Sequence, residues 1–70
     1  MTVTVSVTVN GETRDLPPGV TLEDVVSQLT ASPKGVAAAV NGEVVPRRAW
    51  PAIKLAERDE VEIVTAVQGG

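Results

Sequence analysis

Hydrophobic and polar residues alternate strictly at the start of the chain. From Thr2 to Val9, valine occupies every odd position and a hydroxyl residue every even one. That period of two predicts a β-strand with one buried face and one solvated face. Asn10-Gly11 follows, and because both residues tolerate positive φ they favour a tight hairpin turn into a second strand over Glu12–Leu16. Two prolines then end this strand, since neither can donate to a sheet ladder.

The pattern changes at Thr21, where apolar residues begin to recur with helical spacing. Thr21 offers a hydroxyl acceptor and two acidic residues follow closely, which is typical of a helix N-terminus because the helix dipole favours negative charge there. One apolar stripe at i, i+3, i+4 and i+7 comprises Leu22, Val25, Val26 and Leu29. Residues 32–35, Ser-Pro-Lys-Gly, are expected to stop the helix. A helix with one apolar stripe is expected to bury that stripe against one face of a sheet.

A second hairpin and an irregular connection follow the helix. Val36–Val40 is apolar and β-permissive, Asn41-Gly42 marks the turn, and Glu43–Val45 is a short strand that a proline ends. Trp50-Pro51 allows a turn or a short 3₁₀ segment but no long helix. We expect Trp50 to plug the core beneath this crossover, and a role as an interface anchor is the second interpretation.

The last strand completes a recognisable order of elements. After a polar turn over residues 57–59, alternation returns at Glu60–Ile63 and the apolar character continues to Val67. The order hairpin, helix, short hairpin, crossover and strand predicts an α+β protein with a β-grasp (ubiquitin-like) fold. We expect a mixed four- to five-stranded sheet packed on one main helix, with the last strand parallel to the first at the centre. Residues 1–70 are predicted to form a single domain, with 68–70 as a flexible tail.

Composition excludes most routes to catalysis. The 70 residues include no cysteine and no histidine, which excludes disulfides, thiolate metal sites and histidine general bases. Six basic and nine acidic residues give a net charge of −3, with no basic cluster for nucleic acid. We expect no metal site, no bound cofactor and no membrane segment, and the absence of a signal-peptide pattern favours the cytoplasm. The chain is more plausibly handled by an enzyme than an enzyme itself.

The final residues, Gln68-Gly69-Gly70, point to chemistry at the terminal carboxylate. A carboxylate is a poor electrophile, so acyl transfer from it needs activation by ATP on another protein. Two residues without Cβ let the backbone thread a narrow pocket up to the reacting carbonyl. A frayed terminus or a cloning remnant would have the same sequence.

Several short motifs, in this order and spacing, carry a family resemblance over nearly the whole chain from about Val7. They are Val40-Asn41-Gly42, Val45-Pro46-Arg47 followed by Trp50, a polar turn ending in Asp59, and Gly69-Gly70. Together they resemble the thiamine-biosynthesis sulfur carrier (ThiS) family. The resemblance implies that an ATP-dependent adenylating enzyme activates Gly70, that a sulfur donor system converts it to a thiocarboxylate, and that thiazole synthase receives the sulfur. The protein would be a cosubstrate and its partner would consume the ATP.

Other sulfur carriers with the same fold stay open as alternatives. The last strand has smaller residues than the family often shows, and the N-terminus is a few residues longer. The molybdopterin synthase small subunit usually has prolines before its glycines, and residues 65–68 have none. A cysteine-biosynthesis carrier is disfavoured less clearly. A noncovalent β-grasp binding module, with an inert tail, is the alternative from a different class.

A docking surface near the tail is the remaining prediction. If the odd-numbered residues of the last strand face the helix, Val64 and Ala66 face outward beside the tail and form a candidate patch for a partner. Ordinary surface exposure, or a strand twist that buries both side chains, would explain them equally well. Arg47 is a candidate partner for acidic groups, although solvated loop charges explain it more simply.

Overall fold

The first hairpin forms where the alternation predicts it. In the computed structural model, which describes residues 3–30 and 35–65, β1 (Val5–Val9) pairs antiparallel with β2 (Glu12–Leu16). The turn residues Asn10 and Gly11 have φ of 53° and 85°. The strand begins at Val5, not at Thr2, because Val5 pairs with Leu16 and the prolines after Leu16 leave β1 without a further partner. Val3 is accordingly 69% exposed.

The helix α1 (Leu22–Leu29) begins with a capping box. The Thr21 hydroxyl accepts the Asp24 N–H at 3.2 Å, and the Asp24 carboxylate accepts the Thr21 N–H at 3.0 Å. The first three members of the apolar stripe are buried, but Leu29, in the last turn, is 40% exposed. The helix ends at Leu29 with an extended Thr30, earlier than the predicted stop at 32–35, of which residues 32–34 lie outside the described residues.

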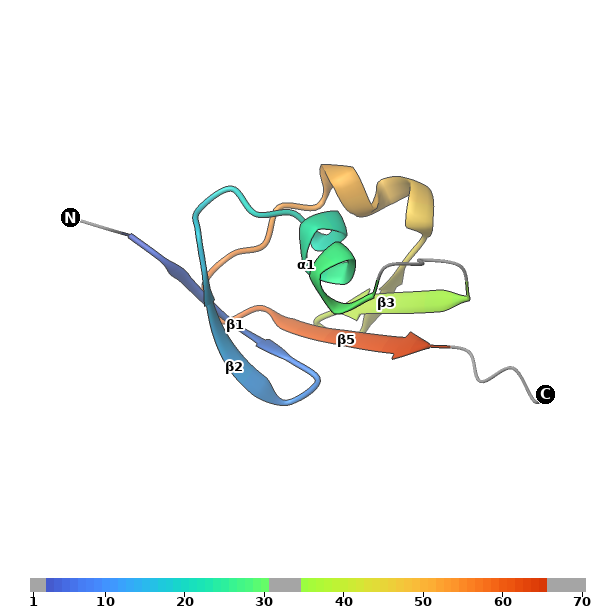
Figure 1. The fold of residues 1–70 in the computed structure, drawn as a ribbon, viewed down its shortest axis with the longest axis horizontal. Helices are drawn as coiled ribbons and strands as arrows, with labels where there is room; N and C mark the ends of the chain where they lie inside the picture. Colours follow the sequence, from blue (N-terminus) through green and yellow to red (C-terminus); the bar gives the residue numbers. More distant parts are fainter. Residues whose placement is uncertain (1–2, 31–34, 66–70) are drawn as a thin grey trace.

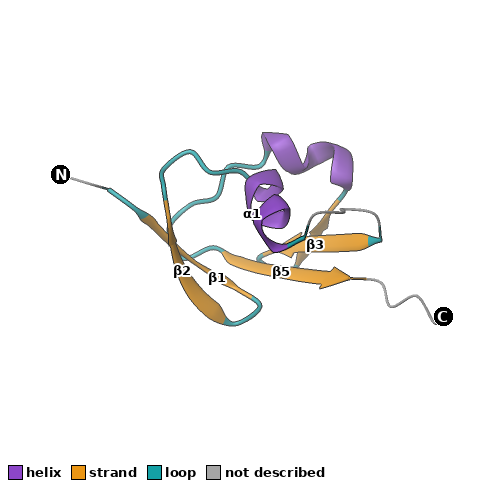
Figure 2. Cartoon of the chain, viewed as in Figure 1, coloured by secondary structure: helices purple, strands orange, loops and turns teal. Residues whose placement is uncertain are grey.

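The sheet has five strands in the order β2-β1-β5-β3-β4. The second hairpin consists of β3 (Val36–Val40) and β4 (Glu43–Val45), and a 3₁₀ segment, η1 (Arg47–Ala52), leads toward β5 (Glu60–Thr65). β5 lies parallel to β1 and antiparallel to β3, so the predicted central, parallel placement of the last strand is confirmed. The helix crosses one face of this mixed sheet (Figure 1). This is the β-grasp arrangement, with η1 covering the same side as α1 (Figure 2).

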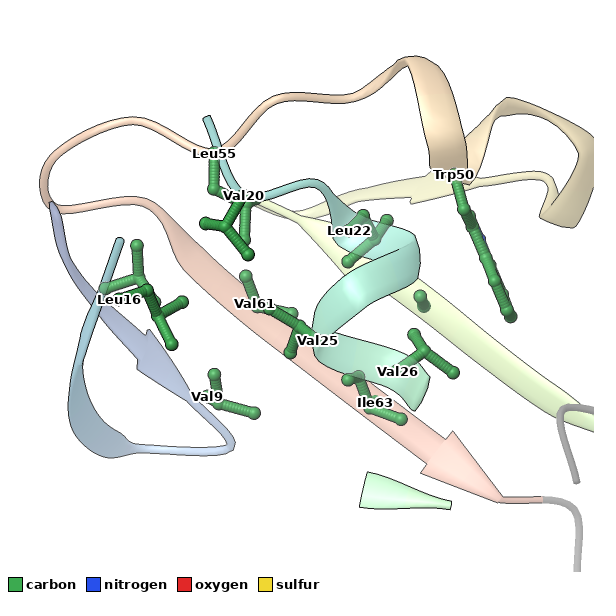
Figure 3. Packing of buried hydrophobic residues seen from close by; sticks show 12 residues of the cluster. Val9, Leu16, Val20, Leu22, Val25, Val26, Trp50, Leu55, Val61 and Ile63 are labelled. Carbon is green, nitrogen blue, oxygen red and sulfur yellow. The ribbon is translucent and has the colours of Figure 1, made fainter. Parts of the chain in front are cut away.

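A single cluster of apolar side chains fills the space between the two layers (Figure 3). Trp50 is the largest member: it is 2% exposed, and its indole N–H donates to the Val45 carbonyl at 2.9 Å. The prediction that Trp50 plugs the core is therefore confirmed, and its polar atom is satisfied. The buried members are Val7, Val9, Leu16, Val20, Leu22, Val25, Val26, Ala38, Trp50, Leu55, Val61 and Ile63.

Candidate carrier tail and docking face

β5 is the element that supports the predicted carrier tail. On one side it pairs with β3 in an unbroken register from Val40 opposite Val61 to Val36 opposite Thr65. On the other side the Thr8 N–H donates to the Asp59 carbonyl at 3.0 Å, at the start of the strand. Strands on both sides fix the direction of β5, which is the direction in which the chain leaves the sheet toward Gly70.

Two turn asparagines hold β5 through their side chains. The carboxamide of Asn10 accepts the Ile63 N–H at 2.8 Å and donates to the Ile63 carbonyl at 3.1 Å. Asn41 accepts the Glu60 N–H through its side chain at 3.0 Å and donates to the Glu60 carbonyl through its backbone at 2.8 Å. The Asn10 carboxamide thus replaces the peptide group of a neighbouring strand. We predicted these asparagines only as turn residues; the repeated choice of asparagine at both turns was the available signal.

Asp59 joins the turn before β5 to the second hairpin. Its carboxylate accepts the Ala56 N–H at 2.7 Å and the side-chain N–H of Asn41 at 3.1 Å. The preceding residue, Arg58, has a φ of 70° and donates its N–H to the Ser6 carbonyl. Asn41 and Asp59 are therefore mutually dependent parts of the motif that carried the family resemblance.

The face of β5 that points away from the helix carries two carboxylates, Glu60 and Glu62, and one apolar side chain, Val64. Val61 and Ile63 are buried on the helix side, whereas Val64 is 63% exposed, as expected for the alternate face. Cross-strand pairing extends this exposed surface, because Ala37 lies opposite Val64 and Ala39 lies opposite Val44, which is 76% exposed. We call this surface the outer patch; it consists of Ala37, Ala39, Val44 and Val64.

Arg47 lies at the same end of the sheet as the start of the tail. Val45, Ala38 and Ile63 form one cross-strand row, and β4 and β5 run in the same direction. Arg47 is exposed at the start of η1 and comes two residues after Val45. Thr65 comes two residues after Ile63, so both residues lie beyond the same end of this row. The structure therefore brings Arg47 and Val64 to one end of the molecule, and their contact with a partner stays a prediction.

The remaining predicted site residues, Ala66, Gln68, Gly69 and Gly70, lie outside the described residues. Within residues 3–30 and 35–65 no group of three or more carboxylates is placed to hold a metal ion. No helix in the same ranges is long and apolar enough to cross a membrane. The chemistry proposed for the tail therefore depends on the sequence of its last residues and on the strand that supports them.

A β-grasp domain with a central last strand that leads into Gly69-Gly70 has the architecture of a small ubiquitin-like carrier. The model of the ThiS family matches residues 7–70, so the chain belongs to the ThiS family of sulfur carrier proteins. It is similar to the solved thiamine biosynthesis protein (ThiS) from Geobacter metallireducens, with a TM-score of 0.78 and 29% identity over 94% of this chain and 100% of that one. Comparison with curated proteins gives no match.

Proposed function

We propose that this sulfur carrier holds its sulfur as a thiocarboxylate on Gly70 and donates it for thiazole formation in thiamine biosynthesis. Support comes from the family match, which extends to Gly70, and from the ThiS structure that the fold resembles. The chain acts as a cosubstrate in the cytoplasm. Its partners are an adenylating enzyme, a sulfur donor system and thiazole synthase, and the adenylating enzyme consumes the ATP.

The chemistry takes place on the partner enzymes in two substitutions, the first at the α-phosphorus of ATP and the second at the carbonyl carbon of Gly70. The Gly70 carboxylate attacks the α-phosphorus of ATP, and pyrophosphate leaves to give an acyl-adenylate. A sulfur nucleophile then attacks the carbonyl carbon, and AMP leaves with the bonding electrons. Glycine at the last two positions keeps the backbone thin enough to enter an activating pocket. The chain supplies the carboxylate and its presentation, and the enzyme supplies the catalytic groups.

Intact mass spectrometry tests this proposal. The carrier is incubated with the adenylating enzyme of the same organism, ATP and sodium hydrosulfide, which replaces the unknown sulfur donor. We expect the mass to rise by the difference between one sulfur and one oxygen atom. An unchanged mass, with an enzyme that adenylates an established ThiS-family carrier in a parallel reaction, contradicts the proposal.

A variant without Gly69 and Gly70 separates the carrier from a noncovalent binding module. The truncated carrier should lose adenylation and keep its melting temperature, because the core cluster and the paired strands consist of residues that the truncation leaves in place. A binding module would keep its partner affinity after the truncation. The rate of sulfur transfer from the carrier is then measured with thiazole synthase and with the synthases of the cysteine and molybdopterin pathways. The synthase that accepts sulfur fastest identifies the pathway that the carrier serves.

A further inference from the structure

The backbone groups of β5 alternate between its two neighbours. The Asn41 N–H donates to the Glu60 carbonyl at 2.8 Å, so the backbone N–H and C=O of Glu60 point toward β3. Because these directions alternate along a strand, the backbone groups of Val64 also point toward β3. The backbone groups of Val61 and Ile63 point toward β1 instead. The Val61 carbonyl accepts the Asn10 N–H at 2.9 Å, and the N–H and C=O of Ile63 bind the Asn10 side chain. By the same alternation, the N–H and C=O of Thr65 point to the β1 side.

On that side β1 has already ended. Its register with β5 covers Thr8 opposite Glu60 and Val9 opposite Val61, and the chain then turns at Asn10. Figure 1 shows β5 running past the tip of the β1–β2 hairpin. Within the described part of the chain, no strand pairs with Thr65 there. Among the described strands, β5 therefore changes at Thr65 from a central strand to an edge strand, whose backbone groups on one side are paired with no other strand.

A free edge of this kind recruits an extended segment of another chain through main-chain hydrogen bonds. Resting on the proposed function, we propose that the adenylating enzyme adds an extended segment to β5 on the β1 side, pairing with Thr65. The Asn10 carboxamide already binds the N–H and C=O of Ile63, so an added strand can pair with β5 on this side only after Ile63. Pairing at this position aligns the residues that lead to Gly70 with the enzyme. The tail then loses less conformational entropy when it enters the active site of the adenylating enzyme.

Charge selects this occupant over a second copy of the carrier. Glu62, on the outer face of β5 and three residues before Thr65, is an exposed carboxylate near the free edge, whereas the carboxylate of Glu12, at the hairpin turn, is paired with Arg14 at 3.5 Å. Two carriers paired through this edge would bring their Glu62 carboxylates toward each other, and each chain carries a net charge of −3. An enzyme segment with lysine or arginine residues beside the paired backbone is complementary to Glu62 and to the net charge of the carrier.

The test changes one backbone atom at a time. The 70-residue chain is chemically synthesised with an ester oxygen in place of the Thr65 N–H, and a matched control carries the same change at Val64, whose N–H faces β3. We expect the Thr65 ester to melt only slightly below wild type, because the ester carbonyl of Val64 accepts more weakly from β3, and to lose about five- to tenfold in kcat/KM for adenylation, the effect of one hydrogen bond. The Val64 ester should melt at a lower temperature. In hydrogen exchange, the Thr65 amide should exchange freely in the isolated carrier and become protected in the enzyme complex.

Three outcomes contradict the inference. The first is an unprotected Thr65 amide in the complex together with an unchanged kcat/KM of the Thr65 ester. The second is protection of that amide in the carrier alone at high concentration, which identifies a second copy as the occupant. The third is a wild-type chain that is never adenylated, which contradicts the proposed function as well. The first two leave the sulfur carrier function intact, so the two failures are distinguishable.

Discussion

The Asn10 carboxamide replaces a piece of β-strand, and Asn10→Gly tests this role. Asn10 has a φ of 53°, which glycine adopts without strain, so the substitution keeps the turn and removes only the side chain. Two hydrogen bonds to Ile63 are lost, at 2.8 and 3.1 Å and partly buried. At about 1 kcal/mol each these contribute about 2 kcal/mol. Relief of backbone strain at a positive φ returns part of that, which leaves a net loss of about 1 kcal/mol.

The loss is large for a domain of this size. A 70-residue chain has a free energy of unfolding of only several kcal/mol, and each kcal/mol shifts its melting temperature by about 4–8 °C. Thermal and urea unfolding followed by the fluorescence of Trp50, the one tryptophan and a buried one, measures the change directly. We expect the melting temperature of Asn10→Gly to fall by roughly 4–8 °C.

Hydrogen exchange supplies the matched control. Asn41→Gly makes the same change at the other turn, where φ is 51°, and removes the side-chain acceptor of the Glu60 N–H. Asn10→Gly should therefore deprotect the Ile63 amide and leave Glu60 protected, and Asn41→Gly should do the reverse. An unchanged Ile63 amide in Asn10→Gly, or a melting temperature equal to that of wild type, refutes the role assigned to the Asn10 side chain.

Three further substitutions probe the core, the start of β5 and the outer patch. Trp50→Phe keeps an aromatic ring but leaves the Val45 carbonyl without its donor, and denaturant titration should show a loss of about 1–3 kcal/mol; stability equal to wild type contradicts the packing described. Asp59→Ala removes the acceptor of the Ala56 and Asn41 N–H groups and should cost about 2 kcal/mol, whereas a neutral result would mean that water replaces the carboxylate. Val64→Asp, at an exposed position, should change stability by less than about 0.5 kcal/mol and raise KM for the adenylating enzyme; an unchanged KM removes Val64 from the docking surface.

The fold follows from sequence patterns that are local and strong. Period-two alternation, two Asn-Gly turns and one helical stripe place every strand and the helix, and the order of elements predicts the parallel centre. Predictions failed at the ends of elements, as at Val3 and Leu29, because burial there depends on how far the neighbouring element extends. The two prolines predicted that β2 stops at Leu16, but the alternation of residues 2–4 does not show that their partner strand has already ended.

The side-chain contacts that position β5 could not be predicted from the sequence. Asn10 and Ile63 are 53 residues apart, and Asn41 and Asp59 are 18 apart, so their pairing depends on the finished topology. The exposure of Val64 followed from alternation alone, but its continuity with Val44 required the strand order. The candidate docking surface was therefore predictable one residue at a time, and its extent was not.

The length of the tail restricts where a partner can bind. Five residues follow Thr65, the last of them Gly70, and an extended chain spans at most about 3.6 Å per residue, so the carboxylate reaches no more than about 18 Å beyond the sheet. β5 is itself about 20 Å long, since six residues rise roughly 3.3 Å each. An enzyme that bound only near the start of β5 would lie about one strand length behind the point where the tail begins. The extended tail is no longer than that strand, so the Gly70 carboxylate could not extend into the enzyme's active site. We therefore expect a productive partner to contact the end of β5, where Val64, Arg47 and the free edge at Thr65 lie.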